Sequence, residues 1–176
     1  MAYLRTSDLR ETYFQKAQAL NESALGYRTP SKRIFLSYKH EDKSKVVPIV
    51  KWLQSKGVNV YIDYLDNELA GKSDIEAAKI LRSRIKGADK FILLASNNIS
   101  GSRWIPWELG LGDGFVSYRN VVRLPLTVAG NWNSKDYYDI YGYIYKSDNT
   151  INYDQWYVTY PDSNFSLIRL EDWLVK

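Results

Sequence analysis

The sequence of 176 residues predicts an α/β protein built on a parallel, doubly wound sheet of four to five strands. Two observations lead to this class. Short apolar runs alternate with helix-spaced apolar patterns between residues 33 and 127, and this alternation implies right-handed crossovers between parallel strands. The run Phe91–Ala95 is apolar at every position, which is typical of a strand that is covered by helices on both faces.

Residues 1–30 are expected to be an N-terminal amphipathic helix and linker, and residues 31–176 to be the main domain. Apolar residues recur at helical spacing from Ser7 to Leu20, with acidic residues in the first turn. The segment around Thr29 and Pro30 has the composition of a linker.

The alternating region then supplies each element of the sheet and its crossovers. Gly57 and Gly87 end two of the helices, and Ser73 with Glu76 forms a capping box that opens one of them. The expected elements are a strand at 34–38, a helix with apolar positions from 46 to 53, a strand at 58–62, a helix at 73–87, a strand at 91–95, a helix from about 104 and a strand at 121–127.

The C-terminal part is dominated by aromatic residues, ten of which fall within residues 132–160. We expect irregular structure there, with a short strand near Trp156–Tyr160. The aromatic side chains are expected to cover the edge of the sheet or to form an assembly surface. A last helix is expected to place Leu167, Leu170 and Leu174 on its inner face.

Composition excludes several classes of function. The chain has no cysteine and a single histidine, His40, so thiolate chemistry and histidine-rich metal sites are excluded, and neither a metal nor a cofactor is expected. The net charge is +4, but the cations are scattered, so nucleic acid is not an expected partner. The sequence shows neither a membrane-spanning run nor a signal-peptide pattern, which predicts a cytoplasmic protein.

Candidate functional residues follow the predicted strands, because ligands bind at the carboxyl ends of the strands in open α/β sheets. Trp104 and Glu108 share one face of a helix at a spacing of four residues. A partly desolvated carboxylate beside an indole suits a substrate with a cationic centre. In the alternative interpretation, which spacing alone favours, Trp104 belongs to the core and Glu108 is a solvated first-turn acid.

Two other patterns carry little functional weight. Ser37 and His40 are three residues apart along a strand-to-loop turn, which is weak geometry for a nucleophile and its base, so we expect His40 to be a solvated histidine. The glycine-rich run 110–114 lies inside a predicted helix, so we interpret it as close packing of small residues and not as a phosphate-binding loop.

Four segments, 33–42, 57–63, 69–72 and 102–110, together resemble a known family. They are similar, in order and spacing, to the motifs of the Toll/interleukin-1 receptor (TIR) domain, in the form typical of bacterial stand-alone TIR proteins. The resemblance covers residues 33–127. It implies a flavodoxin-like fold and an enzyme that cleaves the nicotinamide–ribose bond of NAD, giving nicotinamide and either ADP-ribose or a cyclic ADP-ribose isomer.

The resemblance also implies roles for residues and partners. It makes Glu108 the catalytic residue, with NAD as a substrate and not a cofactor. The residues that it implies bind NAD are Ser37, Tyr38, Lys39, His40, Asp63, Tyr64 and Trp104. It further implies self-association through TIR–TIR contacts and, as in antiphage systems of the Thoeris kind, a separate effector protein that senses the nucleotide product.

Two other functions stay open at the level of sequence. One is a non-catalytic TIR–TIR interaction module, and the other is a secreted effector that mimics host TIR domains. Glu108 beside Trp104 distinguishes the enzyme from a scaffold, which has no chemical reason to keep this carboxylate. The lack of a recognisable secretion signal neither supports nor excludes the effector.

Overall fold

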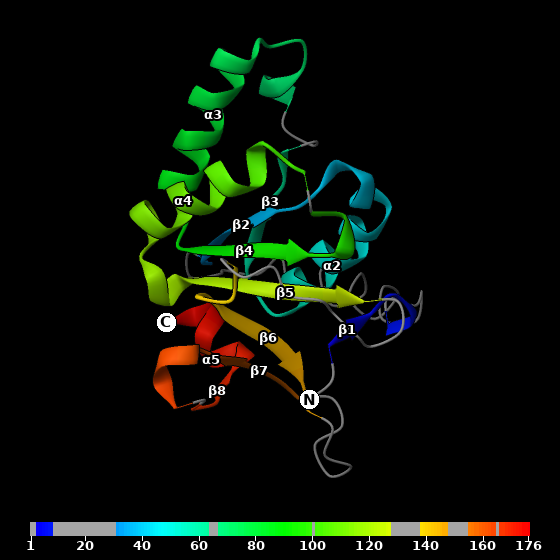
Figure 1. Cartoon of the computed structure of the whole chain (residues 1–176), viewed down its shortest axis with the longest axis vertical. Helices are drawn as coiled ribbons and strands as arrows, with labels where there is room; N and C mark the ends of the chain where they lie inside the picture. Colours follow the sequence, from blue (N-terminus) through cyan, green and yellow to red (C-terminus); the bar gives the residue numbers. More distant parts are fainter. Residues whose placement is uncertain are drawn as a thin grey trace.

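The computed structural model describes residues 3–8, 31–63, 67–99, 101–127, 138–147, 155–164 and 166–176. These residues form one eight-stranded sheet with helices on both faces (Figure 1). The strands are β1 (Leu4–Arg5), β2 (Arg33–Ser37), β3 (Asn59–Tyr61), β4 (Lys90–Ala95), β5 (Val121–Thr127), β6 (Gly142–Lys146), β7 (Trp156–Thr159) and β8 (Ile168–Arg169). The α-helices are α2 (Lys43–Ser55), α3 (Asp74–Lys86), α4 (Trp104–Val116) and α5 (Leu170–Val175).

The sheet confirms the parallel, doubly wound arrangement. Its strand order is β3-β2-β4-β5-β6-β7-β8, and the pairs from β3 to β6 are parallel. The antiparallel strands β7 and β8 extend one end, and β1 pairs in parallel with the end of β5. The parallel part of the sheet, from β3 to β6, has five strands, as expected. The whole sheet has eight strands, which is more than the four to five that were predicted.

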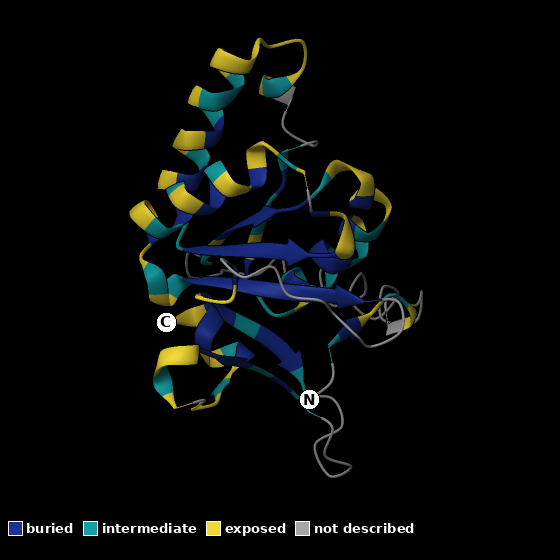
Figure 2. Cartoon of the chain, in the orientation of Figure 1, coloured by how far each residue is buried: buried dark blue, intermediate teal, exposed yellow. Residues whose placement is uncertain are grey.

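Helices cover the two faces of the sheet as the apolar strands require. Alternate residues of β2 point to opposite faces, so that Ile34 and Leu36 pack with α2 and α5, whereas Phe35 packs with α3 and α4. The central strands β4 and β5 are buried at every position, as predicted for Phe91–Ala95 (Figure 2).

The predicted start of α3 is confirmed in detail. The Ser73 hydroxyl accepts a hydrogen bond from the Glu76 backbone N–H, and the Glu76 carboxylate accepts one from the Ser73 N–H at 3.1 Å. This capping box satisfies backbone groups that an uncapped helix end would leave without partners.

The glycine-rich segment of α4 packs as expected at one position. A Cβ at Gly112 would lie 2.7 Å from the ring of Phe91, so only glycine lets α4 approach β4 this closely. Gly110 and Gly114 have nothing within 4 Å of a Cβ, so close packing does not explain them.

The aromatic C-terminal part is more regular than expected. β6 occupies a segment for which irregular structure was predicted, whereas the strand at Trp156–Thr159 is confirmed. A Cβ at Gly142 would lie 2.7 Å from the Tyr160 ring, which explains a glycine at the start of β6. Many of the aromatic side chains, such as Tyr145, are therefore part of the sheet and its core.

The two ends of the chain correct two further expectations. Leu170 and Leu174 are buried in α5, but Leu167 precedes that helix and is 55 % exposed, so its predicted place on the inner face was wrong. Thr6–Asp8 form a short 3₁₀-helix, and the rest of the predicted helix up to Leu20 lies outside the described residues. The pairing of β1 with β5 was not predicted.

Candidate active site

A cleft of about 940 Å³ lies at the carboxyl ends of β2 and β4. The strand order reverses between these two neighbours, since β3 lies beyond β2 on one side and β5 beyond β4 on the other. This reversal is the position at which doubly wound sheets bind ligands. Six of the eight residues predicted for the site line the cleft: Tyr38, Lys39, His40, Asp63, Trp104 and Glu108.

Glu108 lies in the second turn of α4, on the face that packs against the end of β2. It is only 6 % exposed, and its carboxylate accepts a hydrogen bond of 2.7 Å from the Ser37 hydroxyl. The interpretation that spacing alone favoured, a solvated first-turn acid, is therefore wrong. Ser37 does not line the cleft; it is the last residue of β2 and orients the carboxylate through this hydrogen bond.

The surroundings of Glu108 shift its pKa toward neutrality. The pKa of this carboxyl is raised from 4.5 to about 7, chiefly by burial; the hydrogen bond from Ser37 opposes the rise, and the nearby charge of Asp63 adds to it. A carboxyl group with a perturbed pKa at the wall of a cleft is a candidate for chemistry and not for structure alone.

Two tryptophans from the start of α4 form a wall beside this carboxylate. Trp104 is 37 % exposed, so it is not a core residue, and its ring meets that of Trp107 edge-on at 5.4 Å between centroids. An exposed indole next to a buried carboxylate suits a planar, cationic group. Trp107 was not among the predicted site residues.

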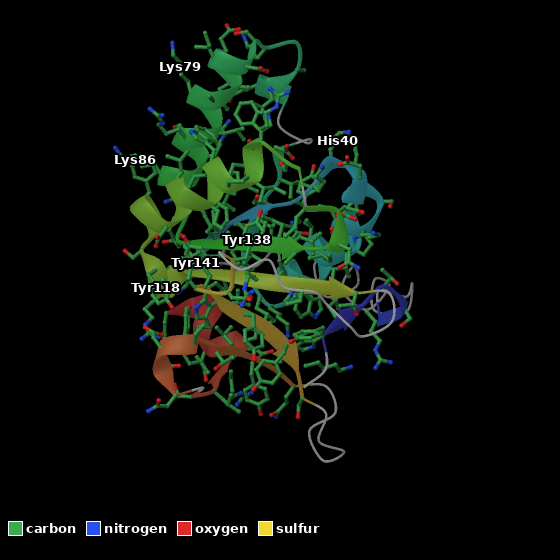
Figure 3. The ribbon with its side chains drawn as sticks, in the orientation of Figure 1. His40, Lys79, Lys86, Tyr118, Tyr138 and Tyr141 are labelled. Atoms are coloured by element: carbon green, nitrogen blue, oxygen red, sulfur yellow. The ribbon has the colours of Figure 1, made fainter. Side chains whose placement is uncertain are left out.

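The loop after β2 forms the opposite side of the cleft. Tyr38 is buried, and the Lys39 ammonium lies 3.6 Å from a carboxylate oxygen of Glu41. His40 is exposed at the rim of the cleft (Figure 3). The Ser37 hydroxyl donates its hydrogen bond to Glu108, so Ser37 and His40 do not form a nucleophile and base pair, as expected.

A buried aspartate fixes this loop to the neighbouring strand. Asp42 is fully buried and accepts hydrogen bonds from Lys45 at 2.7 Å, from Asn98 at 2.8 Å and from Ser96. Ser96 and Asn98 follow β4, so the network joins the loops after the two strands that flank the cleft. The sequence does not reveal this network, because Ser96 and Asn98 lie 54 and 56 residues away from Asp42 along the chain.

The end of β3 supplies a second carboxylate. Asp63 lines the cleft and acts on Glu108 through its charge. Tyr64 lies outside the described residues.

The far wall comes from α3 and was not predicted to belong to the site. Ala77 and Ala78 line the cleft together with Arg82, and Arg103 joins them from the segment before α4. Helical spacing puts the two alanines on the same face of α3 as Leu81. In the structure, Leu81 occupies the core while the alanines remain half-buried at the cleft.

The structure gives two further findings on the described residues. Within these ranges, no group of three or more His, Asp or Glu side chains is placed to hold a metal ion. The helices in the same ranges are also too short or too polar to cross a membrane.

Comparison with known proteins places this cleft in context. The family model described as "TIR domain" matches residues 34–154. The chain is 30 % identical over 146 residues to a protein of Bacillus cereus (strain MSX-D12) named "Probable 3' cyclic ADP-D-ribose synthase ThsB'", covering 80 % of this chain and 74 % of that protein. It is 25 % identical to the Clostridium botulinum CMP N-glycosidase BcmB, with a TM-score of 0.41, over 53 % of this chain and 69 % of that one.

Proposed function

Because this chain belongs to the TIR domain family, we propose that it cleaves the nicotinamide–ribose bond of NAD and releases nicotinamide with ADP-ribose or a cyclic ADP-ribose isomer. The observation that carries the proposal is the buried carboxylate of Glu108, held by Ser37 beside the exposed ring of Trp104. The printed name of the Bacillus cereus relative supports the same chemistry.

The reaction can proceed with one carboxylate because its leaving group is already cationic. The C–N bond breaks, and its electron pair moves to the pyridinium nitrogen, so nicotinamide departs neutral and the positive charge moves to the ribose. No acid is needed to protonate the leaving group, whereas ordinary glycosidases use a second carboxyl group for this step. Water, or a hydroxyl of the same molecule, then adds to the ribose carbon and loses a proton.

Glu108 would stabilise the developing charge on the ribose. Its buried position strengthens the attraction, because few water molecules screen it. The carboxylate must be ionised for this role, and the hydrogen bond from Ser37 favours the ionised form. Trp104 would hold the nicotinamide ring by stacking, and Asp63 adds a second negative charge toward the same end of the cleft.

The wider biological role is part of the proposal. The protein would act in bacterial antiphage signalling, with self-association through TIR–TIR contacts and a separate effector that senses the product. A non-catalytic interaction module is the second candidate, but a scaffold has no use for a buried carboxylate at the wall of a large cleft, since burying it costs stability.

Incubation of the purified protein with NAD over a wide range of protein concentrations tests the proposal. Products are separated by retention and identified by mass. We expect free nicotinamide together with ADP-ribose or a cyclic isomer, and an activity per molecule that rises with concentration. NAD that remains intact at all concentrations would favour the interaction module.

A further inference from the structure

We propose that Asp42 is a positioning residue of the active site, whose carboxylate fixes the loop after β2 (residues 38–42) to the loop after β4 (residues 96–99 and 101–103). The inference rests on the proposed function, because the two loops border the cleft in which the reaction would take place. Asp42 itself does not line this cleft. It would therefore act through the segments that it joins and not by touching the substrate.

The usual local role of an aspartate at this position is not the one that Asp42 performs. Asp42 is the N-cap residue of α2, where an aspartate commonly accepts a hydrogen bond from a backbone N–H of the first helical turn. Its side chain makes no such bond. The carboxylate instead accepts hydrogen bonds from Ser96 and Asn98, which follow β4. The start of the helix therefore does not account for the aspartate.

Burial makes this carboxylate unfavourable unless its oxygens are satisfied. The Asp42 side chain has no exposed surface, whereas that of its ion-pair partner Lys45 is 32 % exposed. Lys45 lies on the same helix, so this ion pair does not join two segments. The bonds from Ser96 and Asn98 do, because they come from residues 54 and 56 positions along the chain. Two of these three partners of the buried acid thus belong to the neighbouring loop.

The same two segments are joined at a second point, by the hydrogen bond from Ser37 to Glu108. Residues 38–41 lie between the two joined points on one side of the cleft, and residues 101–104 lie between them on the other. All eight of these residues line the cleft. The two walls that they form are therefore held to each other at both ends, once through Glu108 and once through Asp42.

Short-range hydrogen bonds transmit the position of the loop after β4 to the start of α4. The Ser102 N–H donates to the Ile99 carbonyl at 3.4 Å, and the Ser102 hydroxyl accepts a bond of 3.2 Å from the Ile105 N–H. A shift of this loop would therefore move the start of α4, which carries Glu108, relative to residues 38–41. Misplacement by about 1 Å can slow an enzyme by about 10²-fold, because the reacting groups must be aligned.

Two variants break the link from opposite sides. Asp42→Asn keeps the shape of the side chain but replaces one acceptor oxygen by a donor. Asn98→Ala removes an exposed partner and leaves the aspartate in place, so it provides a second test if the first variant does not fold. The control is Trp173→Phe, which loses buried hydrogen bonds to the Arg119 carbonyl and the Tyr160 hydroxyl next to the start of β5, at the end of the sheet away from the cleft.

Two readouts on the full chain test the inference, at a temperature at which thermal unfolding shows each variant to be folded. For nicotinamide release from NAD, kcat/KM should fall by at least about tenfold in Asp42→Asn and by about three- to tenfold in Asn98→Ala. In hydrogen exchange without NAD, the backbone of residues 38–41 and 101–104 should exchange faster in both variants. Trp173→Phe should keep both properties even where its melting temperature falls by the same amount.

The outcomes separate this inference from the proposed function. Lower kcat/KM with faster loop exchange, absent from Trp173→Phe, supports the positioning role. Wild-type kcat/KM in Asp42→Asn or unchanged loop exchange overturns it, as does an equal loss in Trp173→Phe, since general destabilisation would then explain the loss. If Asp42→Asn does not fold, Asn98→Ala decides by the same criteria. Intact NAD with the wild type overturns the proposed function, and loop exchange then still decides whether Asp42 holds the two loops together.

Discussion

Replacement of Glu108 by glutamine should make the folded protein more stable at pH 8 than the wild type. Burial raises the pKa of this carboxyl from 4.5 to about 7, so the ionised form is less favourable in the folded state than in the unfolded chain. At 1.36 kcal/mol for each pKa unit, the ionised carboxylate destabilises the fold by about 3 kcal/mol. Glutamine carries no charge and still offers an oxygen to the Ser37 hydroxyl.

The sign of the effect fixes its dependence on pH. Below pH 4.5 the carboxyl is protonated in both states, so Glu108→Gln and the wild type should have similar stability. Between pH 4.5 and about 7 the unfolded chain ionises first, so the wild type loses stability progressively as the pH rises. Above pH 7 the difference should stay constant, since the group is then ionised in both states.

Thermal unfolding of both proteins between pH 4 and pH 9 measures this difference. For a chain of this size, about 3 kcal/mol corresponds to a rise in melting temperature of roughly 6–12 °C at pH 8. Asp162→Asn is the control, because Asp162 is half exposed in a surface ion pair with Arg119 and its change should alter stability by less than about 1 kcal/mol. A gap between Glu108→Gln and the wild type that is absent at pH 8, or equal at every pH, would refute the reasoning.

Two further predictions concern the same carboxyl and the packing beneath it. The rate constant kcat/KM for NAD should rise with pH through about 7, as Glu108 ionises. Because Ser37 lowers and Asp63 raises the pKa of this carboxyl, Ser37→Ala should move the midpoint of the profile to higher pH and Asp63→Asn should move it to lower pH. Midpoints that move in the same direction in both variants would contradict this assignment. In a denaturant titration, Gly112→Ala should lower the free energy of unfolding by about 1–3 kcal/mol, since the added Cβ would lie 2.7 Å from the Phe91 ring. Gly110→Ala is the control: its Cβ would meet no atom within 4 Å, so the free energy of unfolding should stay the same or rise.

The core of the fold could be predicted from local patterns. Apolar alternation and the capping box at Ser73 place the central strands and α3 because these signals act within a few residues. β1 has no such signal, since its two residues gain their structure from β5, more than 120 residues later. β6 has apolar or aromatic side chains at three consecutive positions, from Tyr143 to Tyr145, so its sequence shows no period of two by which the strand could be recognised.

The candidate site was predicted in part for a related reason. Resemblance to the family pointed to Glu108 and Trp104, whereas spacing alone favoured a solvated carboxyl group. Burial depends on the end of β2, which lies 71 residues away in sequence at Ser37. The wall of α3 was missed because alanines such as Ala78 look the same in sequence whether they pack against a core or border a cleft.

The most direct test of the account is the rate of nicotinamide release from NAD at pH 8. It should be measured for the wild type, for Glu108→Gln and for the remote control Asp162→Asn, at protein concentrations that permit self-association. We expect the wild type and Asp162→Asn to release nicotinamide at equal rates, and Glu108→Gln to be slower by at least about 10²–10³-fold. Intact NAD with the wild type, or cleavage by Glu108→Gln at the wild-type rate, would contradict the account.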